Sequence, residues 1–144
     1  MRLDPNYPES YWNLAYAHLQ QRDYEKAEFA AKKAIEVSPD SLIFRARLIH
    51  VYAAWGKTNQ ARIELAKLQS EASQKQEYLP AYQVAVIHTA LQDPDEAFKW
   101  LRQAMTDNDR SWYITELPID AMFDPLRTNP RFAALLAEMK LPGR

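Results

Sequence analysis

Three segments of the chain share one pattern of small, apolar and polar positions. They span residues 23–40, 57–71 and 93–109, and each places an alanine four residues after its first polar residue. These marker alanines, Ala27, Ala61 and Ala97, are separated by 34 and 36 residues. Apolar residues follow at helical spacing, which predicts an amphipathic helix in each segment. A small side chain at a fixed register lets two helices approach to about 8–10 Å, so we expect the marker alanines to be buried where helices cross.

A helix–turn–helix unit that recurs every 34 residues is typical of the tetratricopeptide repeat, and the chain resembles that family over about three quarters of its length. The resemblance divides the chain into repeats at residues 8–41, 42–77 and 78–111. Residues at positions that the family favours are Leu14, Ala15, Ala27, Ala34 and Pro39 in the first repeat, Leu48, Tyr52, Gly56, Ala61 and Leu68 in the second, and Val84, Ala85, Ala97, Leu101 and Ala104 in the third.

The repeats depart from the family pattern in two places. Arg22 stands where the family commonly has glycine. The second repeat has no closing proline and carries two extra residues around 74–76. These departures predict a longer second helix or a looser turn at that point, in a fold that is otherwise kept.

Several helix starts can be predicted from capping residues and prolines. Thr58, Asp93 and Asn129 belong to the residue types that cap helix N-termini, where a side-chain oxygen accepts a hydrogen bond from a free backbone N–H. Pro80 and Pro94 suit the first helical turn, since the N–H that proline lacks would have no partner there.

Both ends of the chain leave the repeat pattern. Residues 1–7 resemble the end of a preceding repeat, and residues 112–144 are predicted to cap the array. The cap is expected to have a short helical turn within 119–126 and an amphipathic helix after Pro130. Its apolar positions are Phe123, Leu126, Phe132, Leu135, Leu136 and Met139. The expected fold class is therefore all-α: one domain over residues 1–144, a right-handed superhelix of tetratricopeptide helix–turn–helix repeats with a C-terminal capping helix.

The composition excludes several classes of protein. The chain has only two glycines, Gly56 and Gly143, so phosphate-binding and dinucleotide-binding glycine loops are absent. It has no cysteine, which excludes disulfides and thiolate chemistry. A net charge of −1 argues against a nucleic-acid partner. The sequence contains neither a membrane-spanning stretch nor a signal peptide, so we expect no membrane contact and a cytoplasmic location.

Candidate catalytic and metal-binding residues are sparse. His18 and His88 occupy a repeat position where the family usually has a core tyrosine, which favours a packing role. The sequence contains neither a zinc-binding HExxH motif nor a GxSxG nucleophile motif. Its acidic pairs lie at helix ends, where they complement the helix dipole or are solvated. We therefore expect no enzymatic activity, no metal and no cofactor.

The resemblance implies one candidate site, the concave groove lined by the first helix of each repeat. The groove positions chosen as partner contacts are Glu9, Trp12, Asn13, Tyr16, Arg47, His50, Tyr82, Gln83 and Val86. Aromatic and arginine side chains of this kind dominate the binding energy of protein interfaces. Two alternatives stay open: Trp12 and Tyr16 cover a face left bare by a missing repeat, or the C-terminal helix folds across the groove.

These observations predict a non-catalytic scaffold that binds a protein or peptide. Some family members grip a C-terminal carboxylate with lysine, arginine and asparagine, but here only Asn13 and Arg47 are available, so an apolar or mixed peptide fits better. The string FDPLRTNPRF resembles the ends of repeat segments in large bacterial signalling proteins, which predicts a C-terminal module of such a protein. The alternatives are self-association, including a homodimer through the N-terminal repeat face, an intramolecular regulatory module, and, less favoured, a small-molecule sensor.

Overall fold

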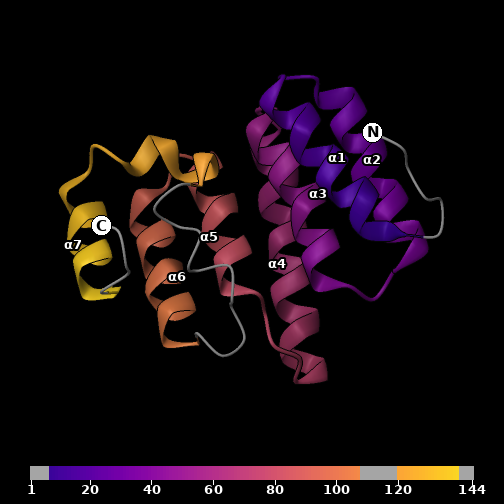
Figure 1. Ribbon diagram of the computed structural model, residues 1–144. Coiled ribbons are helices and arrows are strands. Elements are labelled where there is room, and N and C mark those ends of the chain that lie inside the picture. The colour runs from indigo at the N-terminus through magenta and orange to yellow at the C-terminus, as the bar shows by residue number, and fades with distance from the viewer. Residues whose placement is uncertain (1–6, 108–119, 140–144) are drawn as a thin grey trace. The chain divides into compact units, whose positions relative to one another are not determined.

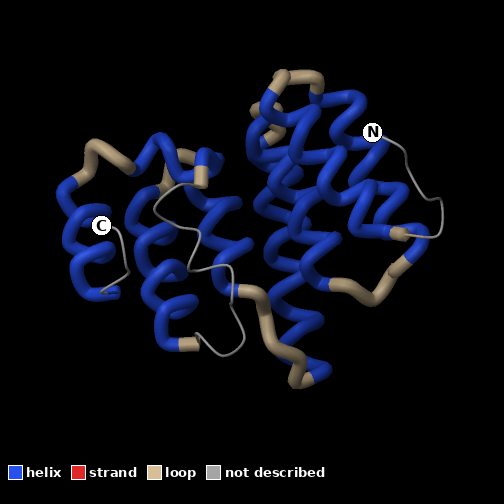
Figure 2. The backbone as a smooth tube through the Cα atoms, viewed as in Figure 1, coloured by secondary structure: helices blue, strands red, loops and turns tan. Residues whose placement is uncertain are grey.

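A computed structural model describes residues 7–107 and 120–139, and every regular element within these ranges is a helix (Figures 1 and 2). The expected all-α class is confirmed. The elements in chain order are α1 (Pro8–Gln20), α2 (Tyr24–Val37), α3 (Leu42–Ala54), α4 (Thr58–Lys75), α5 (Ala81–Ala90), α6 (Pro94–Thr106), the 3₁₀-helix η2 (Ala121–Leu126) and α7 (Pro130–Met139).

The helices pack into two compact units. The first unit, Met1–Leu79, contains α1 to α4, and the second, Pro80–Arg144, contains α5, α6, η2 and α7. The division falls in the loop after α4, next to the two extra residues of the second repeat. No helix in the described ranges is long and apolar enough to cross a membrane.

One turn recurs between α1 and α2, between α3 and α4, and between α5 and α6. Arg22, Gly56 and Gln92 sit at equivalent positions of the three turns with φ of 59°, 83° and 61°, in the left-handed region. In each turn the next backbone N–H donates across the helix end over 2.9 Å: Asp23 to His18, Lys57 to Tyr52, and Asp93 to His88. A left-handed residue followed by this bond satisfies the last helical carbonyls. The first helix of each of the three repeats therefore ends in the same way.

Helix N-termini follow the predicted capping residues in part. The carboxylate of Asp93 accepts a hydrogen bond from the Glu96 N–H at 3.4 Å, and Pro94 is the first residue of α6, as predicted. Thr58 is not a cap: α4 already includes it, and Lys57 precedes the helix without a side-chain hydrogen bond. Contrary to the prediction, Pro80 is not in the first turn of a helix: it lies one residue before α5 and has extended backbone.

The core of the first unit is built largely from alanine. Ala15 of α1, Ala27 and Ala31 of α2, and Ala61 of α4 are fully buried. Small side chains at these positions allow the close approach of neighbouring helices. Ala97 of the second unit is also fully buried, so the predicted burial of all three marker alanines is confirmed.

Helix α4 is longer than its counterpart in the first repeat, with 18 residues against 14 in α2. It continues to Lys75, and the chain then turns at Gln76, whose φ of 55° is left-handed. The expected longer second helix is thus confirmed, and the extra residues form its last turn and the bend that follows. The Arg45 guanidinium of α3 bonds the Glu71 carboxylate of α4.

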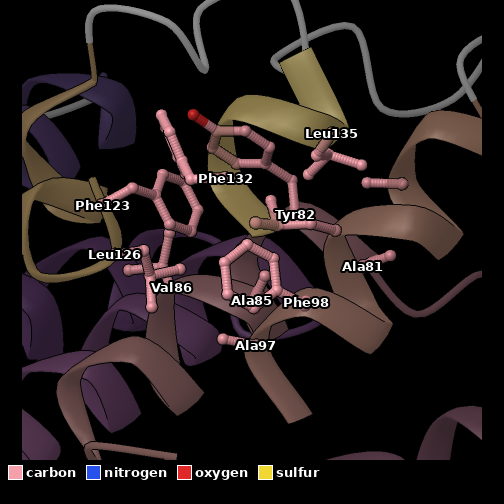
Figure 3. Packing of buried hydrophobic residues seen from close by; sticks show 12 residues of the cluster. Ala81, Tyr82, Ala85, Val86, Ala97, Phe98, Phe123, Leu126, Phe132 and Leu135 are labelled. Carbon is pink, nitrogen blue, oxygen red and sulfur yellow. The ribbon is translucent and has the colours of Figure 1, made fainter. Parts of the chain in front are cut away.

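The second unit has one core, to which η2 and α7 contribute (Figure 3). Phe123 and Leu126 of η2 and Phe132 and Leu135 of α7 are buried with α5 and α6 side chains. Leu136 packs against this cluster and is partly exposed. The side chain of Met139, also named as part of the predicted stripe, lies outside the described residues. The expected short helical turn within 119–126 is η2, with Ile119 outside the described residues.

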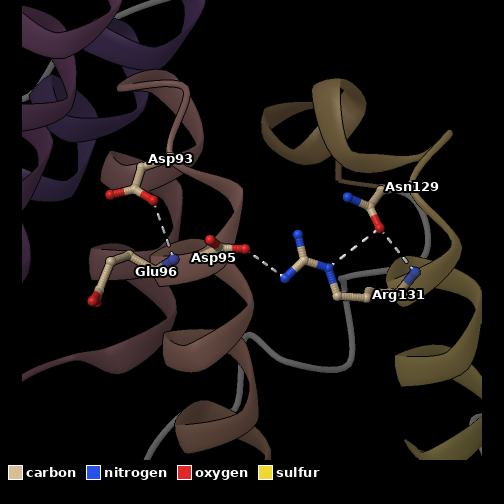
Figure 4. A network of polar contacts seen from close by, with 5 residues as sticks. All are labelled: Asp93, Asp95, Glu96, Asn129 and Arg131. Carbon is tan, nitrogen blue, oxygen red and sulfur yellow. Dashed lines mark hydrogen bonds and ion pairs between the residues drawn. The ribbon is translucent and has the colours of Figure 1, made fainter.

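Polar contacts complete the attachment of α7 (Figure 4). The Asn129 side-chain oxygen accepts a hydrogen bond from the Arg131 N–H at 3.0 Å, so Asn129 caps α7 as predicted. The Arg131 guanidinium donates to the Asp95 carboxylate of α6 at 2.8 Å.

Candidate partner-binding surface

The nine predicted contact residues fall in different units of the structure. Six of them, Glu9, Trp12, Asn13, Tyr16, Arg47 and His50, lie on α1 and α3 of the first unit. The other three, Tyr82, Gln83 and Val86, lie on α5 of the second unit. The two groups are described separately below.

Arg47 and two aromatic rings form the centre of the first group. The guanidinium carbon of Arg47 lies 4.1 Å from the ring centroid of Trp12 and 5.0 Å from that of Tyr16. Trp12 and Tyr16 are four residues apart and therefore share one side of α1. A cation within about 6 Å of an aromatic face is attracted by the ring quadrupole, most strongly where water is excluded. Arg47 is only 2% exposed, so α3 holds both rings of α1 through a desolvated cation.

Both rings retain partial exposure although the cation beneath them is buried. Glu9 and Asn13, one helical turn apart on α1, are exposed beside them. We call Glu9, Trp12, Asn13 and Tyr16, with Arg47 and His50 behind them, the α1/α3 face. It combines partly exposed aromatic rings with exposed polar side chains, which is the composition of an interface centre and its rim.

His50 lies one turn after Arg47 on α3 and is 9% exposed. Burial, together with the positive charge of Arg47, lowers the pKa of His50 to about 3. The imidazole is therefore neutral at physiological pH. It contributes to the α1/α3 face as an uncharged, mostly buried side chain.

All three α5 residues are buried, and Tyr82 and Val86 belong to the core of the second unit. Tyr82 and Val86 are 2% and 1% exposed, and Gln83 is also buried. The Tyr82 hydroxyl donates to the Asp120 carboxylate at 2.5 Å, and its ring meets Phe123 edge-on with centroids 5.2 Å apart. Tyr82 and Val86 therefore pack with η2 instead of lining an open surface. The 3₁₀-helix η2 lies against α5, whereas the C-terminal helix α7 packs with α6.

His18 and His88, which occupy the same repeat position, are packed as the sequence predicts. His18 is partly buried and His88 is 7% exposed. In residues 7–107 and 120–139, no three acidic or histidine side chains come together as a metal site would require.

Sequence reasoning missed a second aromatic cluster and an exposed apolar pair. The rings of Tyr24 and Trp55 stack at 5.8 Å, and the Lys57 ammonium lies 3.7 Å from the Trp55 centroid. Phe29 of α2 and Ile63 of α4 are 64% and 56% exposed. These two residues occupy the same position of successive repeats, so the repeat alignment alone could have revealed the pair.

The described carboxylates with shifted pKa values are poor candidates for acid catalysis. Burial raises the pKa of Glu28, but hydrogen bonds from Tyr52 and Lys32 outweigh that effect, and the net shift is downward. A hydrogen bond from Arg45 lowers the pKa of Glu71. A general acid at neutral pH requires the opposite shift.

The family model of the tetratricopeptide repeat matches residues 8–41, the segment that folds into α1 and α2. This match supports a place for the chain in the tetratricopeptide repeat family, whose repeats generally mediate protein–protein interaction and are typically non-catalytic. No curated protein and no solved structure matches the chain.

Proposed function

We propose that the chain is a non-catalytic interaction module that binds a peptide or protein segment on the α1/α3 face. The observation that carries this proposal is the position of the Arg47 guanidinium within 5.0 Å of both the Trp12 and Tyr16 rings. This arrangement fixes two partly exposed aromatic rings before any partner arrives. Fixing contact groups in advance lowers the entropy that binding would otherwise lose.

The chemistry of the α1/α3 face selects the kind of segment that it binds. Trp12 and Tyr16 offer flat apolar surface, and Arg47 behind them is only 2% exposed. Glu9 and Asn13 supply one carboxylate and one amide at the border. A segment with an apolar or aromatic side chain flanked by neutral or basic residues therefore fits better than an acidic tail.

The wider setting of the module is also part of the proposal. We place it at the C-terminal end of a larger bacterial signalling or regulatory protein in the cytoplasm. Support comes from the likeness of the FDPLRTNPRF string to the segments that close repeat arrays in such proteins. In that setting the module would bring a partner to the catalytic or regulatory domain of the same protein.

Selection from a random peptide library tests the proposed binding surface. The full chain is immobilised, peptides are selected from a displayed library, and the affinity of each is measured by calorimetry. Replacing Trp12 by alanine should weaken the selected peptides about tenfold or more, since aromatic hot spots contribute on that scale. Asn13→Arg, which changes an exposed position without touching the core, should weaken them as well.

Phe29→Ala is the matched control, because it removes an aromatic ring that is more exposed than Trp12 and lies on α2. It should leave the affinity unchanged. Peptides that lose affinity with Phe29→Ala and keep it with Trp12→Ala and Asn13→Arg would contradict the proposal.

A further inference from the structure

A cleft of about 440 Å³ lies in the first unit, beside the turn between α1 and α2. Its lining comes from that turn, from the first residues of α2 and from the residue after α3: Gln21, Arg22, Asp23, Tyr24, Glu25 and Trp55. None of these residues belongs to the α1/α3 face. Pockets for small molecules measure about 300–1,000 Å³, so this cleft has the volume for a small ligand. We call it the Tyr24/Trp55 cleft.

Two stacked aromatic rings form the apolar part of the cleft. The ring centroids of Tyr24 and Trp55 are 5.8 Å apart, and the rings are inclined by 19°. Both rings pack against the buried core of the first unit and keep partial exposure. The Lys57 ammonium lies 3.7 Å from the Trp55 centroid, a cation–π contact. The cleft therefore offers partly exposed aromatic surface, on which the ring of a ligand can stack or meet an edge.

Arg22 and Glu25 supply one charge of each sign to the lining. Both residues are exposed, and within the part of the chain that the structure describes neither side chain forms a hydrogen bond or an ion pair. Asp23 between them is already engaged, because its carboxylate accepts a hydrogen bond from the Lys26 N–H at 3.3 Å and pairs with the Lys26 ammonium at 3.7 Å. The charges of the lining that a ligand can pair with are therefore one guanidinium and one carboxylate.

These groups match a small ligand that carries an anion, a cation and an aromatic ring. A free amino acid with an aromatic side chain has all three. A guanidinium binds a carboxylate through charge-assisted hydrogen bonds, and a carboxylate binds an ammonium in the same way. The interior of a peptide backbone has neither end charge, and a bare phosphate has neither the cation nor the ring.

We propose that the Tyr24/Trp55 cleft binds a free aromatic amino acid as its zwitterion. Arg22 holds the ligand carboxylate, Glu25 holds the ligand ammonium, and the ligand ring packs on Tyr24 and Trp55. This function goes beyond the peptide binding proposed for the α1/α3 face and does not depend on it, since the two sites share no residue.

The test uses the full chain, L-phenylalanine as the probe, and calorimetry. We expect saturable binding with a dissociation constant of about 1 mM or below. Three analogues each lack one feature: N-acetylphenylalanine lacks the ammonium, phenylalanine amide lacks the carboxylate, and L-alanine lacks the ring. Each analogue should bind about tenfold more weakly, because a hydrogen bond to a charged group and an aromatic contact each contribute on that scale.

Arg22→Gln and Glu25→Gln assign each ligand charge to its partner. Arg22→Gln should keep the turn, since Gln92 adopts left-handed backbone with φ of 61° at the equivalent position of the third repeat. It should weaken phenylalanine about tenfold and bind phenylalanine and its amide alike. Glu25→Gln should also weaken phenylalanine about tenfold, and it should bind phenylalanine and the N-acetyl derivative alike. Such loss of discrimination against one analogue measures the pairwise interaction.

Arg62→Gln and Asp40→Asn are the matched controls. Arg62 lies on α4 and Asp40 in the turn after α2, and both are exposed and without an ion pair in the described ranges. They change the net charge as the two test variants do and should leave the affinity within about twofold, as for a distant charge. The proposal is overturned if phenylalanine does not bind at about 1 mM, if the analogues bind as tightly as phenylalanine, or if the controls weaken binding as much as Arg22→Gln and Glu25→Gln do.

Discussion

His50 shows how a single residue couples the α1/α3 face to pH. Burial and, to a smaller extent, the charge of Arg47 lower the pKa of its imidazole from 6.5 to about 3. The unfolded chain therefore binds a proton at His50 below pH 6.5 while the folded chain does not. The contribution of His50 to the free energy of unfolding is fully present above pH 6.5 and is lost as the pH falls toward 3.

This difference predicts the acid sensitivity of the chain. Between pH 7 and pH 5 the free energy of unfolding should fall by about 2 kcal/mol through His50 alone. The pKa values of Glu28 and Glu71 are lowered from 4.5, so their contributions are lost only at lower pH. Urea denaturation at the two pH values measures the fall, and His50→Gln should remove most of it. An equal fall in the His50→Gln variant would contradict the assignment.

At the residue scale, the sequence predicts small buried positions better than the surroundings of large ones. Ala27, Ala61 and Ala97 can be predicted from their register because repeated helix crossings require a small side chain. Tyr82 has the composition of a hot spot, but its hydroxyl bonds Asp120 and its ring packs on Phe123. Asp120 lies 38 residues further along the chain, and no periodic pattern connects two such distant positions.

The recurring turn is the most informative element, because it tolerates three different residues at one left-handed position. Gly56 adopts φ of 83° without strain, and a Cβ added there would meet no atom within 4 Å. Arg22 and Gln92 take φ of 59° and 61° with side chains that disfavour this region. In the first and third repeats the turn therefore forms although Arg22 and Gln92 disfavour left-handed backbone.

Exchanging residues at this position should therefore change stability in opposite directions. Gln92→Gly should stabilise the chain by up to about 1 kcal/mol, and Gly56→Ala should destabilise it by about 1 kcal/mol, because left-handed backbone costs a non-glycine residue about that much. Thermal and urea unfolding measure both. Gln103→Gly, the same exchange inside α6, should instead destabilise by about 1 kcal/mol. Destabilisation by Gln92→Gly as large as by Gln103→Gly would contradict the role given to the turn.

Helix α7 is buried on one side only, and that side packs into the core of the second unit. Leu135 is fully buried in the core of the second unit, and its neighbour Ala134 is exposed. Leu135→Asp should destabilise the second unit by about 3 kcal/mol or more, since it removes a buried side chain and buries an unpaired charge. Ala134→Asp should change the free energy of unfolding by less than about 0.5 kcal/mol.

Urea unfolding and binding of a hydrophobic dye distinguish the two α7 variants. The Leu135→Asp chain should bind dye under native conditions because the apolar side of α6 loses its cover. If both variants unfold at the same urea concentration and bind no dye, α7 does not cover the core of the second unit.

Elements of this chain can be predicted where periodicity is strong and are less certain at their boundaries. The all-α class, the long α4 and the amphipathic α7 follow from apolar spacing and from the extra residues near 74–76. The start of α4 is displaced by one residue from the Thr58 prediction, because Thr58 is already helical. A capping side chain specifies a helix start only when it forms its bond, which Asp93 does and Thr58 does not.

At the scale of the whole molecule, the predicted contact residues divide between two kinds of environment. Those on α1 and α3 form a face whose aromatic rings are partly exposed, whereas Tyr82 and Val86 on α5 are core residues of the second unit. Repeat positions are equivalent in sequence, but a terminal repeat also packs with the segment that follows it. This is why register alone does not predict the burial of α5.

Residue-resolved mapping tests the central proposal, that the α1/α3 face binds peptides, most directly. Amide chemical shifts of the isotopically labelled full chain are recorded while a peptide selected from the random library is added. The account predicts that the largest shifts fall on α1 around Trp12 and Tyr16 and on α3 around Arg47, with α2 little changed around the exposed Phe29. Largest shifts around Phe29 and Ile63, with α1 unchanged, would contradict it.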